Sequence, residues 1–183
     1  MKRLISITTV VVLCSALFFV VVDASANEQS SKGTWSGTNN VSPSTGACLE
    51  AGGIAESEAS GVGIVSHWGA VTWVGDKMCV FLLLPTGVYP EYFPVSQGSG
   101  AGTITTASGD EIYLEMVFTL IGNPNPITFG GHDKGTWTQD VTMVGGTGRF
   151  TNLTGHAYGS GVWTNNNDGT LSWEGTSIGA FEY

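Results

Sequence analysis

One histidine in the sequence has surroundings that could support proton transfer. His67 lies in residues 65–75, where strand alternation would place it on one inward face with Trp73. An imidazole on an apolar inward face can act as a general acid or base in a cavity. The alternative is a core histidine whose ring is satisfied by Ser66, Thr72 or a backbone carbonyl. His67 is therefore the first candidate catalytic residue.

Glu115 is the second candidate catalytic residue. A carboxylate lining a hydrophobic cavity has a raised pKa and could exchange protons or stabilise developing positive charge. Alternation within residues 111–120 puts Glu115 on the face opposite the apolar one, so a solvated carboxylate is the alternative. The same alternation places Tyr113 beside Glu115.

The predicted ligand-binding residues are Trp73, Tyr113 and Arg149. Trp73 shares the predicted face of His67, and Tyr113 shares that of Glu115. Arg149 follows a glycine-rich turn, which it is expected to tie through hydrogen bonds to carbonyl or carboxylate groups. Binding of an anion is the alternative role for Arg149.

The sequence predicts neither a metal site nor a cofactor. His67, His132 and His156 are dispersed, without the spacing of a zinc-binding helix. The stretch Gly145–Phe150 resembles a dinucleotide fingerprint, but the residues that follow it are poor helix formers. The sequence predicts no nucleophile elbow, so it does not indicate a serine hydrolase.

The elements that must position these side chains follow an apparent export signal. Residues 1–26 begin with Lys2 and Arg3, continue as an apolar run, and end in the small residues Ala24-Ser25-Ala26. This pattern is typical of a cleaved signal peptide, with a retained membrane anchor as the alternative. We therefore expect one domain, residues 27–183, exported to the periplasm or the extracellular space.

The net charge bears on the expected binding partners, and the cysteine content bears on a disulfide. Loss of the leader would change the formal net charge from −9 to −10, so neither nucleic acid nor an anionic membrane surface is an expected partner. Two cysteines would remain, Cys48 and Cys79. In an exported protein such a pair is expected to form a disulfide, with two separate thiols as the alternative.

The rest of the chain predicts an all-β fold without a convincing helix. Short runs rich in β-branched and aromatic residues alternate with Gly, Asn, Asp and Pro clusters. Hairpin turns are expected at Asp76-Lys77, Ser108-Gly109-Asp110 and Asn167-Asp168-Gly169, and residues 141–163 should form a further hairpin. The predicted strands are 33–41, 53–66, 68–74, 78–84, 100–106, 111–121, 135–144, 152–164 and 170–181. Short connections between so many strands favour a single antiparallel up-and-down β-barrel of about eight strands.

Three glycine- and aromatic-containing motifs carry a family resemblance. They are G-V-G-I-V-S-H-W-G from Gly61, G-G-T-G-R-F from Gly145 and G-T-L-S-W-E-G from Gly169. With the export signal, they resemble bacterial exported proteins with an allene oxide cyclase-like or dirigent-like barrel. The resemblance implies an eight-stranded barrel with an apolar cavity, often trimeric. It also implies cofactor-free steering of a reactive small molecule through cyclisation or coupling. No catalytic position is carried over from that family.

Three functions are consistent with these observations. The favoured one is binding of a hydrophobic small molecule in the cavity, with cofactor-independent cyclase or isomerase chemistry as its extension. A glycan-active protein is the first alternative: Glu115 with Glu174 or Asp140 would supply two carboxylates, and tryptophans would stack on sugars. A filled, non-catalytic barrel acting through its surface is the second. Residues 78–84 are apolar on both faces, so a cover or a second subunit, in a dimer or trimer, is expected there.

Overall fold

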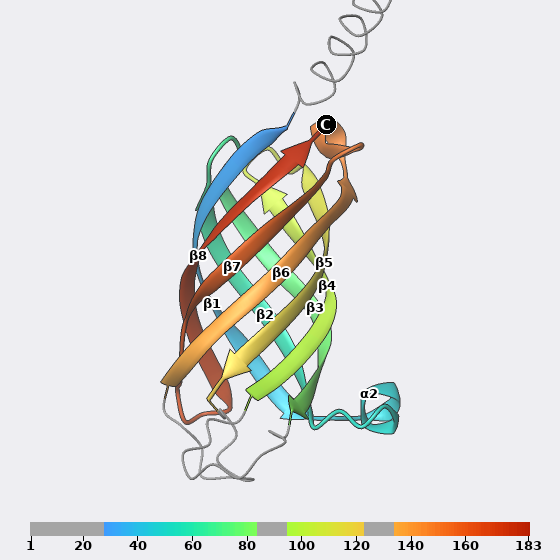
Figure 1. Cartoon of the computed structure of the whole chain (residues 1–183), viewed down its shortest axis with the longest axis vertical. Helices are drawn as coiled ribbons and strands as arrows, with labels where there is room; N and C mark the ends of the chain where they lie inside the picture. The colour runs from blue at the N-terminus through green and yellow to red at the C-terminus, as the bar shows by residue number, and fades with distance from the viewer. Residues whose placement is uncertain (1–27, 84–94, 123–133) are drawn as a thin grey trace, which may run out of the picture.

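The protein is a closed antiparallel β-barrel of eight strands, as the computed structural model of residues 28–83, 95–122 and 134–183 shows (Figure 1). Strands adjacent in sequence are adjacent in the sheet, and β8 pairs with β1 to close the barrel. The strands are β1 (Gln29–Pro43), β2 (Ala55–Val65), β3 (Gly69–Leu83), β4 (Val95–Thr106), β5 (Glu111–Ile121), β6 (Lys134–Gly146), β7 (Thr154–Asn165) and β8 (Thr170–Glu182). This confirms the predicted up-and-down barrel. The predicted signal peptide lies outside the described residues.

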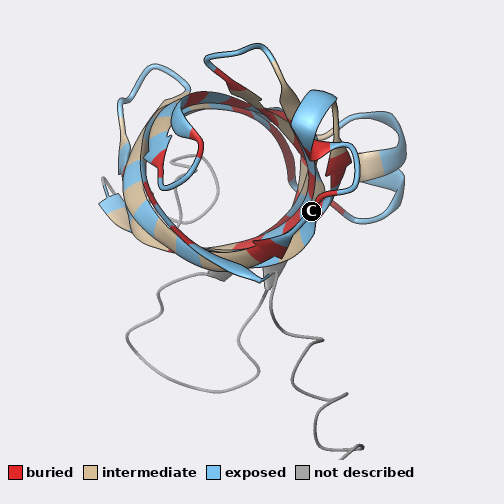
Figure 2. Ribbon diagram, turned by 90° about the horizontal axis from the view of Figure 1, so that it is seen from above, coloured by how far each residue is buried: buried red, intermediate tan, exposed pale blue. Residues whose placement is uncertain are grey.

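Side chains alternate between the inside and the outside of the barrel wall. On β5, Ile112 and Leu114 are buried, whereas Tyr113 and Val117 on the opposite face are exposed. The same alternation of buried and exposed positions is visible around the barrel wall in Figure 2. A strand points successive side chains to opposite faces, so the apolar positions converge on one interior core. The face assignment made for residues 111–120 is confirmed.

The hairpin predicted at Asp76-Lys77 is wrong. β3 runs through these residues as one long strand, and its pairing with β4 shifts register between Gly75 and Cys79. Asp76 and Lys77 are both exposed, so two consecutive side chains point to the outside of the barrel. A β-bulge accommodates such an extra residue without ending the strand.

Two other turns confirm their predictions. β4 and β5 are joined at Ser108-Gly109-Asp110, where Gly109 adopts a φ of 87°. β7 and β8 are joined around Asp168, whose carboxylate accepts hydrogen bonds from the backbone N–H and the hydroxyl of Thr170 at 2.9 and 2.6 Å. These bonds favour the charged carboxylate and lower the pKa of Asp168.

The predicted hairpin over residues 141–163 is also present. It consists of β6 and β7, joined through the short 3-10 helix η2 (Gly148–Phe150). Phe150 and Leu153 in this connection are fully buried. In Figure 1 this connection lies at the end of the barrel that carries the C-terminus, so its side chains cap that end of the core.

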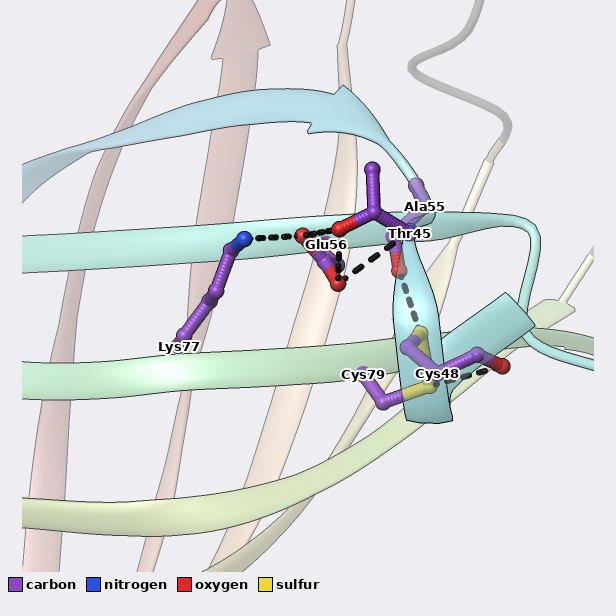
Figure 3. The surroundings of a disulfide bond; sticks show 6 residues. All are labelled: Thr45, Cys48, Ala55, Glu56, Lys77 and Cys79. Carbon is purple, nitrogen blue, oxygen red and sulfur yellow. Dashed lines mark hydrogen bonds and ion pairs between the residues drawn. A yellow bond between two sulfur atoms is a disulfide. The ribbon is translucent and has the colours of Figure 1, made fainter. Parts of the chain in front are cut away.

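A short helix departs from the prediction of a chain without helices. The five-residue α2 (Gly46–Glu50) lies in the connection between β1 and β2, at the opposite end of the barrel from the C-terminus (Figure 1). None of its residues is buried. Its position is fixed by the disulfide between Cys48 in α2 and Cys79 in β3, with Cα atoms 5.5 Å apart (Figure 3). The predicted disulfide is confirmed, and it ties α2 to Cys79 of β3. The cover or second subunit expected over residues 78–84 stays a prediction.

An ion pair lies next to the disulfide. Glu56 on β2 is buried although it faces outward, and it pairs with Lys77 of the β3 bulge (Figure 3). The backbone N–H and hydroxyl of Thr45 donate hydrogen bonds to the same carboxylate, at 3.2 and 3.1 Å. The hydrogen bond with Lys77 is the largest cause of the lowered pKa of Glu56, and the bonds from Thr45 lower it further. The same contact with Glu56 raises the pKa of Lys77. The bulge therefore positions a cation that anchors the β1–β2 connection.

Candidate ligand-binding cavity

The interior of the barrel contains a cavity of about 110 Å³. All eight strands contribute to its wall, and the side chains are mostly apolar. All six tryptophans of the chain line it: Trp35, Trp68, Trp73, Trp137, Trp163 and Trp173. The fold and this cavity define a class of molecule, a small closed barrel with an aromatic interior.

Glycines in the wall make room for these large side chains. A Cβ at Gly61 would lie 2.8 Å from ring atoms of Trp173, and one at Gly63 would lie 2.8 Å from ring atoms of Trp35. Real Cβ atoms do not approach other heavy atoms so closely, so each indole occupies the space of an absent side chain. A narrow barrel can therefore hold six tryptophans and still contain a cavity.

Three of the indoles form a connected aromatic group across the interior. Trp173 on β8 makes T-shaped contacts with Trp73 on β3 and Trp137 on β6, with ring centroids 5.6 and 5.9 Å apart. Edge-to-face packing of this kind is favourable for aromatic quadrupoles. The wall at this level is thus an ordered aromatic surface.

A second aromatic group closes the end of the barrel that carries the C-terminus. Trp68, in the β2–β3 turn, packs against Phe150 and Phe181 with ring centroids 6.0 and 5.3 Å apart. Tyr183 packs on Phe181 at 5.3 Å. Phe150 and Phe181 are fully buried, and Trp68 is the member of this group that lines the cavity.

Hydrogen bonding divides five of the six indoles into two groups. The N–H groups of Trp35, Trp137 and Trp163 donate to Ser177 Oγ at 2.9 Å, Val162 O at 3.2 Å and Thr136 O at 3.2 Å. Nε1 of Trp68 and of Trp173 and Oδ1 of Asn39 are buried without a hydrogen-bond partner in the described structure. Buried polar atoms normally have partners, so these three atoms are unsatisfied polar groups carried by residues that line the cavity.

Trp73 is the predicted site residue that lines the cavity. Its side chain is buried on the inner face of β3, as alternation predicted. The structure does not bring the two predicted catalytic residues into the cavity wall with it.

The expectation that His67 lies on an inward strand face is wrong. His67 is in the turn between β2 and β3, exposed, with a φ of 70°. Its ring contacts the edge of Phe181 with centroids 6.1 Å apart. The turn interrupts the alternation, so Trp68 turns inward instead, although the uninterrupted pattern pointed it outward.

Glu115 and Tyr113 lie on the outer surface of β5. Both are exposed, and Glu115 is paired across the sheet with Ala101 and Thr142. The Tyr113 hydroxyl donates to Glu111 Oε2 at 3.1 Å, which raises the pKa of Tyr113. Neither side chain faces the cavity that the ligand-binding prediction assumed.

Arg149 is exposed on η2, with its guanidinium carbon 4.7 Å from the ring centroid of Phe150. This is the geometry of a cation–π contact. Arg149 thus packs on the aromatic group that closes the barrel end, and its side chain does not line the cavity.

The described residues contain no group of three or more His, Cys, Asp or Glu side chains arranged to hold a metal ion. Among them, too, no helix is long and apolar enough to cross a membrane.

Comparisons of the chain with protein-family models, with curated proteins and with solved structures found no match. The assignment of function therefore depends on the cavity and its wall.

Proposed function

We propose that this protein is an exported β-barrel that binds a hydrophobic small molecule in its interior. The observation that supports this most directly is the cavity of about 110 Å³ walled by tryptophan, methionine and leucine side chains. Apolar cavities stay dry and take up apolar molecules: an engineered cavity of roughly 150 Å³ binds benzene. A ligand of about the size of one substituted aromatic ring suits the space.

The disulfide bond supports the proposal that the protein is exported. Disulfides form and persist in oxidising compartments, and the Cys48–Cys79 bond is part of the fold. A periplasmic or extracellular location, reached through residues 1–26 as a signal peptide, would account for the disulfide.

Binding has more support than chemistry. A cofactor-independent cyclisation or isomerisation, as the resemblance to allene oxide cyclase-like and dirigent-like barrels implies, needs a group that moves protons or stabilises charge. The described residues of the cavity wall include Ser31, Asn39, Gln139 and Ser177 as their non-aromatic polar side chains, and none carries a formal charge. Catalysis remains an extension of the proposal.

The glycan-active alternative gains no support from the positions of its residues. The tryptophans that were to stack on sugars line the barrel interior. Glu115 and Asp140 project from the outer surface of β5 and β6. Carboxylates that cleave a glycosidic bond must flank a sugar held in a cleft.

Self-association is a separate proposal, based on the outer wall. Val62 and Ile64 on β2 and Val74 on β3 are 56, 67 and 56 % exposed. Exposed aliphatic side chains grouped on adjacent strands favour contact with a second subunit. Sedimentation at micromolar concentration tests it: a dimer or trimer is expected, and a monodisperse monomer would contradict it.

Calorimetric titration of the purified, oxidised protein with toluene tests the binding proposal. We expect saturable binding with one site per barrel. Ala157→Leu adds a larger side chain at a position that lines the cavity and should abolish that binding. Ala101→Leu makes the same change on the exposed face of β4 and should leave binding unchanged. Absence of binding to the unmodified protein, or equal binding to both variants, would overturn the proposal.

A further inference from the structure

We propose that the cavity selects a ligand with a hydroxyl group, held between the indole N–H of Trp173 and the side-chain amide of Asn39. This inference rests on the proposed function and specifies the chemical class of its ligand: a small apolar alcohol or phenol. It starts from the two unpartnered polar atoms that β8 and β1 contribute to the same part of the wall.

The pairing of β1 with β8 places the two side chains near each other. Asn39 is paired with Leu171, and Trp173 is paired with Gly37, so Asn39 and Trp173 are diagonal neighbours. Diagonal neighbours on one face of an antiparallel pair are about 7–8 Å apart, within reach of aromatic and long side chains. Both side chains line the cavity.

Packing directs the polar edge of Trp173 toward β1. A Cβ at Gly37 would collide with Cζ2 of Trp173, which is bonded to the ring carbon that carries Nε1. The edge of the indole that contains Cζ2, next to the carbon that carries Nε1, therefore lies over β1 and β2, and β1 is the strand that carries Asn39. One donor and one amide group thus occur on neighbouring residues of a mostly apolar wall.

A hydroxyl group is complementary to both atoms. It accepts a hydrogen bond from the Trp173 N–H and donates one to Asn39 Oδ1. The amide nitrogen of Asn39 is already used, since it donates to Ser57 Oγ at 3.1 Å. Reversing the amide would leave its N–H₂ group free, and a hydroxyl oxygen would accept from it, so the match holds in either orientation.

A pure hydrocarbon would leave the unsatisfied atoms buried, which is costly. A carboxylate would bring a charge into a wall without a cation. A neutral hydroxyl avoids both penalties. Phenol is the test ligand because it differs from toluene by the replacement of a methyl group with a hydroxyl.

The experiment measures the ratio of the Kd for phenol to the Kd for toluene in the oxidised protein and its variants. Trp173→Phe and Asn39→Leu each remove one hydrogen-bonding partner and should raise this ratio about two- to tenfold, the range that one hydrogen bond contributes. Trp35→Phe is the matched control, because Trp35 also lines the cavity but its N–H already bonds to Ser177. We expect the control to change both Kd values without changing their ratio.

The outcomes separate this inference from the proposed function. If toluene binds but neither Trp173→Phe nor Asn39→Leu raises the ratio, or if Trp35→Phe raises it equally, the hydroxyl site is wrong and cavity binding stands. Should neither probe bind the unmodified protein, both proposals fail. Using two variants on different strands keeps the test decisive if one of them does not fold.

Discussion

The indole of Trp35 lies on the bare backbone of Gly63, its direct cross-strand partner in the β1–β2 pair. A Cβ at Gly63 would be 2.8 Å from two ring atoms of Trp35, and the closest atoms it would meet all belong to that one side chain. The glycine thus has a packing role that is specific to one tryptophan. The arrangement resembles the aromatic covering of strand glycines used to stabilise designed sheets.

We predict that Gly63→Ala destabilises the barrel by about 1–3 kcal/mol, the usual cost of overpacking. Gly159→Ala is the matched control, because its added Cβ would meet Trp137 at 3.1 Å, where a small shift suffices. In a Trp35→Leu background the penalty of Gly63→Ala should fall below about 0.5 kcal/mol, which a double-mutant cycle of urea unfolding measures. An undiminished penalty in that background would contradict the role assigned to Trp35.

Much of this architecture could be predicted from local sequence. Alternation on residues 111–120 identified the buried face of β5, and turn residues identified the hairpins at Gly109 and Asp168. The Cys48–Cys79 bond was predicted from the cysteine count and the expectation of export. Each of these inferences depends on a repeat of two residues or on a local turn preference, which the sequence displays directly.

The errors arose where a strand departs from its regular period. The bulge at Asp76-Lys77 has the polar composition of a turn, and nothing local indicates that β3 continues beyond it. The turn at His67 resets the alternation and exchanges the sides of His67 and Trp68. Alternation holds only within a regular strand, so the residues of a turn or a bulge cannot be assigned to a face without the fold.

The candidate site was only partly predictable. Alternation placed Trp73 on an inward face, and the structure places it in the cavity wall. It could not single out Trp173 or Asn39, because the lack of a hydrogen-bond partner depends on neighbours from other strands. Composition showed that tryptophans were available, whereas the pairing register showed which two polar atoms occur together.

The division of β5 into two faces predicts unequal losses of stability for two truncations. Leu114 is 4 % exposed and faces the cavity, so Leu114→Ala should cost about 2–5 kcal/mol through lost burial and an enlarged void. Val117 is 43 % exposed on the outer face, and Val117→Ala should change stability by less than about 0.5 kcal/mol. Urea unfolding of the oxidised proteins measures both, and similar losses in the two variants would contradict the inward assignment.

The disulfide should contribute substantially to stability. It spans 31 residues, and the loop-entropy estimate for such a span is about 3–4 kcal/mol. The free energy of unfolding should therefore fall by about that amount in the Cys48→Ala/Cys79→Ala variant. Urea unfolding compares it with the oxidised parent, and an unchanged free energy of unfolding would contradict this contribution of the bond.

Gly53 offers a more local test of the same bond. A Cβ at this position would collide with both sulfur atoms and lie 2.8 Å from the Cys48 carbonyl oxygen. We predict that Gly53→Ala increases the fraction of free thiol found after oxidative refolding, as titration with a thiol reagent measures. In the Cys48→Ala/Cys79→Ala background, Gly53→Ala should have a smaller effect on stability because the two sulfur atoms are absent.

The ion pair between Glu56 and Lys77 predicts an acid dependence of stability. Hydrogen bonding and attraction to Lys77 lower the pKa of Glu56 in the folded protein below its ordinary value of 4.5. The folded state therefore favours the charged carboxylate. Its stabilising contribution is complete above pH 4.5 and is lost as the pH falls through the lowered pKa.

Lys77→Met removes the largest cause of this shift and leaves a buried carboxylate with Thr45 as its remaining partner. We expect lower stability than the parent at pH 7, and a difference between the two that shrinks as the pH falls through the lowered pKa of Glu56. Glu56→Gln should reduce the acid dependence, because it removes the titrating group and keeps an amide that Thr45 can contact. Urea unfolding at a series of pH values tests both variants. A difference between Lys77→Met and the parent that stays constant from pH 7 to pH 3 would exclude Glu56 as the group responsible.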